Sequence, residues 1–201
     1  CCQKRAFWYP TERFLFFDPC HRPASPMRLL LSLLLFLSLL VPSMPALAAE
    51  QQVWIQRIGG EESGEVLGSV MARDTSDGLV ISPSISGLAA GAYGFHLHEN
   101  GRCDSGLKDG VQVAGLAAGG HWDPDNTGSH QGPFGVGHRG DLSRLVIDAD
   151  GTSTTPVVAP RLGVDDLKGR AFIIHAGGDT YSDEPPLGGG GARIACGVAG
   201  E

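Results

Sequence analysis

The chain has 201 residues, of which 42% are hydrophobic and 18% charged, and it carries a formal net charge of −7. This acidic balance argues against binding to nucleic acid or to anionic membrane surfaces, because both require positive charge on the protein.

The first 26 residues carry no pattern of a folded domain. They precede Met27, the one methionine suited to start the segment that follows. We interpret residues 1–26 as a non-native upstream extension and leave them out of the fold prediction. This step removes the residues Cys1, Cys2, Cys20 and His21 from consideration.

Residues 27–48 have the pattern of a secretory signal peptide. Arg28 gives a basic start, an apolar run covers residues 29–41, and an A-x-A pattern ends at Ala48. The apolar run is shorter than the roughly 20 residues that a membrane-spanning helix needs, so a membrane anchor is the weaker interpretation. We predict export, followed by cleavage and no membrane attachment.

One domain, residues 49–201, remains after cleavage, and its length is enough to bury a core. It has 10 basic and 20 acidic residues, for a net charge of −10. Its two cysteines, Cys103 and Cys196, lie far apart in a chain bound for an oxidising compartment. We therefore expect a disulfide, the alternative being two buried free thiols.

Short β-branched or alternating segments recur through this domain, separated by glycine, proline, aspartate and serine. No convincing amphipathic helix lies between them. The pattern predicts an all-β fold, an eight-stranded antiparallel sandwich or barrel. The expected strands cover residues 52–58, 66–73, 79–85, 93–99, 142–148, 152–158, 171–176 and 193–197.

Two long connections interrupt the short strands, residues 100–141 and residues 177–192. Loops of this length inside a compact domain are usually functional or disordered. The histidines of the domain lie in or beside these loops, so we expect the loops to carry function. These histidines are His96, His98, His121, His130, His138 and His175.

The first two histidines belong to one predicted strand. Alternation along a strand places Phe95 and Leu97 on one face and His96 and His98 on the other. The apolar pair can then enter the core while both imidazoles face a common ligand. Alone, this pair is weak evidence, since exposed strand faces often carry polar residues.

A second group lies on the glycine-rich segment 121–141, where His121, His130, His138 and Asp141 follow one another. So flexible a loop orders poorly by itself, and a metal ion could fold it. Three imidazoles and one carboxylate match a closed tetrahedral zinc site.

His175 ends an apolar strand and alone could be a core histidine with its hydrogen bonds satisfied. Together with His96 and His98 it forms a set of three imidazoles that suits copper, and a fourth imidazole would make the site tetragonal.

These residues resemble the copper/zinc superoxide dismutases, specifically their bacterial periplasmic branch. The resemblance covers nearly the whole domain and implies a Greek-key β-sandwich, a periplasmic location, and dismutation of superoxide to oxygen and hydrogen peroxide. The motifs that carry it are residues 94–99, 120–121, 137–142, 174–175 and 187–197.

The resemblance also implies the metal ligands, for one copper and one zinc ion. His121 would be shared, as a deprotonated imidazole that opens on the copper side and takes up a proton when copper is reduced. Zinc, which is redox-inert, would order the loop. The implied copper ligands are His96, His98, His121 and His175, and the implied zinc ligands are His121, His130, His138 and Asp141.

Further roles rest on the resemblance alone. Asp179 matches a carboxylate that links a copper ligand to a zinc ligand, although it could be an ordinary turn aspartate. Arg193 matches the arginine over copper, its alternative being a solvated edge-strand charge. Cys103 and Cys196 match the family disulfide. Lys108, in an insertion typical of the bacterial branch, matches a lysine that attracts substrate.

Two other functions would use similar residues. A copper and zinc storage or buffering protein of the cell envelope would need the same ligands but not Arg193. A two-metal hydrolase would lean on bridging carboxylates, and here only Asp141 is available. The sequence leaves a homodimer open, because Trp122 could lie at a dimer contact or pack under its loop.

Overall fold

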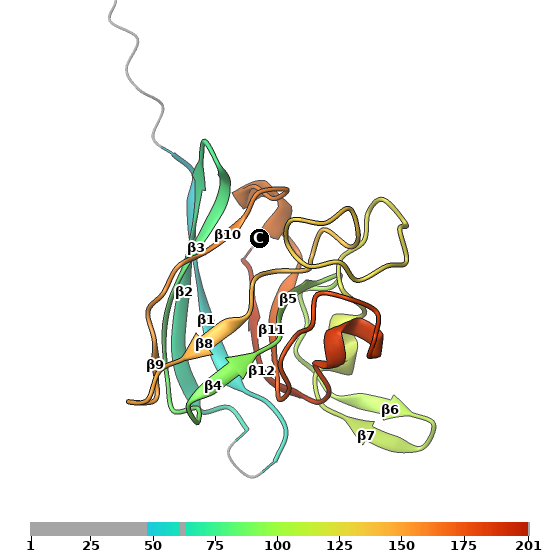
Figure 1. Ribbon diagram of the computed structural model, residues 1–201. Helices are drawn as coiled ribbons and strands as arrows, with labels where there is room; N and C mark the ends of the chain where they lie inside the picture. The colour runs from blue at the N-terminus through green and yellow to red at the C-terminus, as the bar shows by residue number, and fades with distance from the viewer. Residues whose placement is uncertain (1–47, 61–62, 201) are drawn as a thin grey trace, which may run out of the picture. The chain divides into compact units, whose positions relative to one another are not determined.

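The computed structural model describes residues 48–60 and 63–200 (Figure 1). The upstream extension, residues 1–26, lies outside the described residues, and so does the predicted signal peptide except for Ala48. Within the described part of the chain, no helix is long and apolar enough to cross a membrane.

The domain is built from antiparallel strands, which confirms the predicted all-β class. An eight-stranded sheet runs in the order β10-β3-β2-β1-β12-β11-β5, with β9 also paired to β3, and β4-β8 and β6-β7 form two smaller sheets (Figure 1). The strands are β1 (Glu50–Arg57), β2 (Val66–Thr75), β3 (Gly78–Ser86), β4 (Gly91–Tyr93), β5 (Phe95–His98), β6 (Gly106–Lys108), β7 (Val111–Val113), β8 (Leu145–Ile147), β9 (Thr152–Ser153), β10 (Val157–Ala159), β11 (Ala171–His175) and β12 (Arg193–Val198). The 3-10 helices of the described residues are η2 (Leu116–Ala118), η3 (Val164–Leu167) and η4 (Pro186–Gly189).

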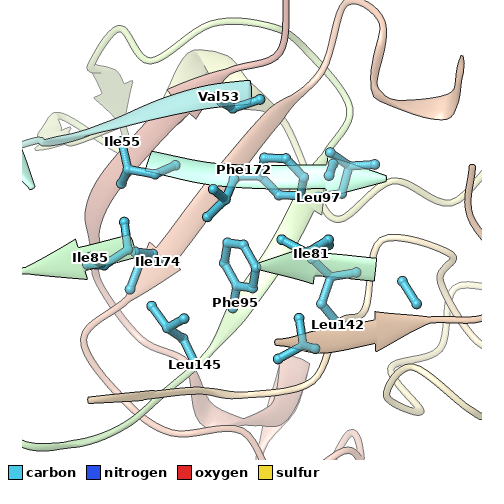
Figure 2. Packing of buried hydrophobic residues seen from close by; sticks show 14 of the residues in the cluster. Val53, Ile55, Ile81, Ile85, Phe95, Leu97, Leu142, Leu145, Phe172 and Ile174 are labelled. Atoms are coloured by element: carbon cyan, nitrogen blue, oxygen red, sulfur yellow. The ribbon is translucent and has the colours of Figure 1, made fainter. Parts of the chain in front are cut away.

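The core lies on one face of β5 and β11. Antiparallel pairing sets Leu97 opposite Phe172 and Phe95 opposite Ile174, and all four side chains are fully buried (Figure 2). The rings of Phe95 and Phe172 stack with their centroids 5.3 Å apart. Burial of each such side chain contributes about 1.5–3 kcal/mol. This packing fixes the two strands whose opposite face carries the histidines.

The predicted strand 93–99 is wrong in one respect, because the chain changes sheets within it. Tyr93 ends β4, which pairs with β8, whereas Phe95 begins β5, which pairs with β11. Gly94 between them donates its N–H to Gly177 and accepts the N–H of His175 through its carbonyl. These backbone bonds turn the corner, and alternation alone could not reveal them.

The predicted strand 152–158 is also divided. β9 and β10 both pair with β3, but residues 154–156 between them lie outside the ladder. Pro156 has no N–H to donate, so the break has a local cause. The connection 100–141, expected to be a loop, contains the hairpin of β6 and β7.

Candidate metal centre

Two clusters of buried side chains share His121. One contains His96, His98, His121 and His175, and the other contains His121, His130, His138 and Asp141; in each cluster the donor atoms lie within 4.8 Å of one another. His96 and His98 come from β5, and His175 comes from the end of β11 beside it. The structure therefore brings together both predicted ligand sets.

The strand-borne histidines are oriented by hydrogen bonds on their outer nitrogens. His98 donates from Nδ1 to the Gly119 carbonyl at 3.0 Å, and His175 donates from Nδ1 to the Gly191 carbonyl at 3.3 Å. Because these partners only accept, the protons must lie on Nδ1, which leaves both Nε2 atoms with free lone pairs. The two Nε2 atoms lie 3.3 Å apart. Two lone pairs this close repel each other unless a cation is bound between them.

His96 gives the same indication. Its Nε2 donates to Asp179 Oδ2 at 2.7 Å, and its buried Nδ1 has no hydrogen-bond partner. Buried polar atoms in proteins are almost always paired, so an orphaned ring nitrogen inside a cluster of imidazoles points to a metal. With His98 and His175, this donor set fits copper.

The second cluster surrounds one carboxylate oxygen. Asp141 Oδ1 lies 3.0 Å from His121 Nδ1, 2.9 Å from His130 Nδ1 and 3.2 Å from His138 Nδ1. His130 Nδ1 is nevertheless badly aligned for a hydrogen bond and counts as unpartnered. Ring nitrogens that converge this closely on one carboxylate are expected around a bound ion, and one carboxylate with three imidazoles fits zinc.

Asp179 connects the two clusters. Its Oδ2 accepts from His96, and its Oδ1 accepts from His130 Nε2 at 2.8 Å and from the Tyr181 N–H at 2.7 Å. Asp179 is 4% exposed, which does not fit an ordinary turn aspartate. Gly188 lies against it with φ 73°, and a Cβ there would come within 2.3 Å of Oδ1. The close approach of the second long loop therefore requires glycine.

Burial and neighbouring charges set opposite protonation preferences for His130 and for two histidines of the first cluster, His96 and His175. Burial lowers the pKa of His96 to about 3 and that of His175 to about 4. Burial alone would also lower the pKa of His130, but the adjacent carboxylates of Asp141 and Asp179 outweigh it and raise this pKa to about 9. Burial would raise the pKa of Asp141, yet the surrounding histidines hold it well below its usual range.

Arg193 is joined to the first cluster through one carbonyl. Its guanidinium donates to the carbonyls of Gly115 and Gly119, and the Gly119 oxygen, 2.6 Å from Arg193 Nη2, is also the acceptor for His98. Burial lowers the pKa of Arg193 without removing its charge. Three residues along β12, Cys196 forms a disulfide with Cys103, so the predicted pairing is confirmed.

Two other residues, Lys108 and Trp122, belong to neither cluster. Lys108 is exposed on β6, and no contact joins it to the metal centre within the described residues. Trp122 is half-buried, packs against the core and lies under the Arg170 guanidinium, 4.0 Å from its ring centroid. This position agrees with the second of the two interpretations of Trp122.

Sequence reasoning missed several supporting groups. The acceptor carbonyls of Gly119 and Gly191 carry no residue signal. Asp183 was also missed; its carboxylate accepts the backbone N–H of His130, with both oxygens at 3.1 Å. The β6-β7 hairpin did have a signal, since Asp109-Gly110 is a typical two-residue turn with positive φ at both positions.

Comparison with known proteins gives a consistent result. The sequence model of the family copper/zinc superoxide dismutase matches residues 66–199. Superoxide dismutase [Cu-Zn] 2 of Salmonella typhimurium is 49% identical over 155 residues, which cover 76% of this chain and 90% of that protein. The Cu/Zn superoxide dismutase from Brucella abortus has a similar structure, with a TM-score of 0.72, 47% identity, and coverage of 75% of this chain and 99% of that one. The monomeric copper, zinc superoxide dismutase from Salmonella enterica gives a TM-score of 0.67 and 49% identity, with coverage of 75% and 99%.

Proposed function

This chain belongs to the copper/zinc superoxide dismutase family, and we propose that its two buried clusters are one copper site and one zinc site that share His121. The protein is an enzyme that uses copper and zinc to convert two superoxide anions and two protons into oxygen and hydrogen peroxide. The position of His121 is the observation that supports one copper site and one zinc site with a shared ligand. Its Nδ1 lies at Asp141, while its ring centroid is 3.9 Å from that of His96.

In this arrangement the protein side chains hold the metals and handle protons and substrate. Bound copper supplies one-electron redox chemistry, whereas zinc supplies charge and order. His98 and His175 present their Nε2 atoms because Gly119 and Gly191 fix the opposite nitrogens. His121 can hold a proton on Nε2, on the side of the copper ligands, while Nδ1 stays at Asp141.

Arg193 is proposed to bind the superoxide anion. Two of its five N–H groups are used on the Gly115 and Gly119 carbonyls, which leaves others for a small oxyanion. The shared Gly119 carbonyl holds the guanidinium in a constant position relative to His98. The disulfide at Cys196 supports the same strand, and Asp179 would orient His96 and His130 together.

The proposed location is the periplasm. The signal-peptide pattern of residues 27–48 and the disulfide between Cys103 and Cys196 both support export. A cleaved, periplasmic form can be checked by N-terminal sequencing of the protein recovered by osmotic shock. Recovery of uncleaved protein from the cytoplasm would contradict this proposal.

A homodimer remains a prediction. Trp122 gives it little support, because this ring packs against the core and under Arg170. Sedimentation equilibrium of the mature enzyme would decide between monomer and dimer.

The storage and hydrolase alternatives are not favoured, since the relatives are named as dismutases. The deciding experiment measures superoxide decay by pulse radiolysis, together with the metal content of the same sample. We expect one copper and one zinc per chain, decay that a copper chelator abolishes, and uncoupling of the two metals in His121→Ala. A single metal in well-folded protein would contradict the division into two sites.

A further inference from the structure

Arg161 hydrogen-bonds the loop of the zinc cluster, and within the described residues its acceptors are all backbone carbonyls. It follows β10 in a turn of the chain, and its guanidinium reaches the glycine-rich loop that carries His130 and His138. Nη1 donates to the Gly137 carbonyl at 2.7 Å, and Nη2 donates to the His138 carbonyl at 2.6 Å and, more weakly, to the Gly132 carbonyl at 3.5 Å. One side chain thus holds both ends of the segment 132–138.

The backbone turn that contains Arg161 is held in place by the sheet. Ala159 and Leu162, on either side of the turn, are 3% and 5% exposed, and the Leu162 N–H bonds to the Ala159 carbonyl. Pro160 packs so closely on Gly78 that a Cβ there would come within 2.6 Å of the Pro160 Cα. The turn is therefore part of the β-sheet framework, and its position does not depend on the loop.

The loop needs such an anchor. Its segment 132–138 contains three glycines, and its two large apolar side chains, Phe134 and Val136, are 75% and 79% exposed and so add little apolar packing. Fixing so flexible a segment costs conformational entropy, and a metal site that is ordered in advance binds its ion more tightly. The His138 carbonyl belongs to a proposed zinc ligand, so the contact acts on the ligand directly.

The charge of Arg161 is not used in an ion pair. Among the described residues it has no acidic partner, and its Nε is buried without a hydrogen bond. A positive charge behind a cation site repels the cation, so electrostatics alone would weaken zinc binding. Any benefit to zinc must come from positioning.

We propose that Arg161 is a positioning residue for the zinc site, which holds the loop 132–138 in its ligating conformation through its fork of backbone hydrogen bonds. This inference rests on the proposed assignment of His130 and His138 to zinc. The fork distinguishes arginine from lysine, since an ammonium group cannot span the same carbonyls with planar, fixed geometry.

The test measures the zinc Kd of mature Arg161→Lys and Arg161→Met by competition with a chelator. Arg170→Lys is the matched control, because Arg170 is also half-buried, has an unpartnered Nε, and donates to the carbonyls of Asp166 and Lys168 in its own segment. We expect both Arg161 variants to bind zinc about 10- to 100-fold more weakly. Arg170→Lys should change the zinc Kd less than threefold, and the copper Kd should not change in any variant.

Spectroscopy gives a second readout that a general loss of stability would not move. Cobalt(II) bound in the zinc position reports ligand geometry through its visible absorption. The band should shift in Arg161→Lys and stay unchanged in Arg170→Lys. If Arg161→Met does not fold, Arg161→Lys carries the test, because lysine keeps the aliphatic stem and the charge.

Three results would overturn the inference. An unchanged zinc Kd in Arg161→Lys, with a lower Tm, would make Arg161 merely structural. Tighter zinc binding in Arg161→Met than in the wild type would show that charge repulsion dominates. A wild-type zinc Kd in the His138→Ala variant would overturn the ligand assignment itself, and this inference with it.

Discussion

The two halves of the metal centre are built in different ways. The copper half takes His96, His98 and His175 from β5 and β11, where the ladder sets Ile173 opposite His96 and Ala171 opposite His98. In the zinc half, only the ends of the loop are paired, through single bridges of Asp141 with His96 and of His121 with His98. His130 and His138, in the middle, have no ladder.

This difference shows what replaces a ladder when ligands lie on a loop. Side chains bind the loop backbone instead: Asp183 accepts the His130 N–H, Asp141 at the end of the loop accepts the Gln131 N–H through Oδ2 at 3.0 Å, and Arg161 donates to the His138 carbonyl. Sheet packing thus fixes copper ligands whether or not metal is bound, while the zinc ligands depend on separate ties and on the ion.

The largest effects are expected when one metal ligand is removed from each half in separate variants. His98→Ala should lower the dismutation rate by more than about 100-fold and leave zinc bound, because loss of a ligand exceeds the roughly 10- to 100-fold cost of losing an orienting partner. His138→Ala should release zinc and reduce hydrogen-exchange protection over residues 123–140, with β5 and β11 still protected. Equal loss of protection in loop and strands would contradict the comparison.

The disulfide ties the connection 100–119 to β12 and so supports the copper half. It joins cysteines 93 positions apart in the sequence, and cross-links of this kind contribute about 2–5 kcal/mol. Replacing Cys103 and Cys196 together by serine should lower the free energy of unfolding by that amount, measured in urea. Arg193, on the same strand, should also lose its constant position, so the rate should fall while zinc affinity is unchanged.

Variants of Arg193 test how the copper half attracts and binds superoxide. Superoxide is an anion, and the mature chain has a net charge of −10, so local positive charge must oppose the average field. Electrostatic steering raises association rates by about 10 to 10³ in steered enzymes, among which this family is an example. We expect the rate constant to fall in the order Arg193→Lys, Arg193→Ala, Arg193→Glu, with both metals retained. Parent-like turnover by Arg193→Glu at low salt would exclude the role.

In the metal-free protein, His130 of the zinc half and His96 and His175 of the copper half should contribute stability with opposite pH dependence. The pKa of His130 is raised to about 9, so its contribution is complete below about 6.5 and is lost as pH rises through 9. The pKa values of His96 and His175 are lowered to about 3 and 4, so their contribution is present above about 6.5 and is lost as pH falls toward those values. Urea unfolding of chelated protein should show both slopes. His130→Gln should flatten the alkaline slope, and His175→Gln should reduce the acid slope.

The sequence predicts the strand-borne copper half better than the contacts that hold the loop of the zinc half. Alternation predicted that Phe95 and Leu97 enter the core opposite His96 and His98, because the strand period acts over neighbouring residues. The hydrogen bonds of Arg161 and Asp183 to the loop were not predicted, because they join residues 24 and 53 positions apart and their partners are backbone atoms. The corner at Gly94 was missed for the same reason, because its partners are backbone groups of Gly177 and His175.

The smallest expected effect concerns Lys108, which is exposed on β6 and has no contact with the metal centre among the described residues. Its influence on superoxide can only act through solvent, where screening limits it to a Debye length of roughly 10 Å at 0.1 M salt. Lys108→Ala should therefore lower the rate constant only about two- to threefold at low salt, and the difference should disappear as salt rises.

Lys168 provides the matched control for that measurement. It is the other lysine of the mature domain, it follows η3, and it pairs with Asp165 at 3.0 Å. Lys168→Ala changes the net charge by the same amount as Lys108→Ala, so the average field of the two variants is equal. A slower rate in Lys108→Ala alone therefore assigns the effect to the position of Lys108. Equal slowing in both variants would instead assign it to net charge, and the insertion that carries Lys108 would then have no steering role.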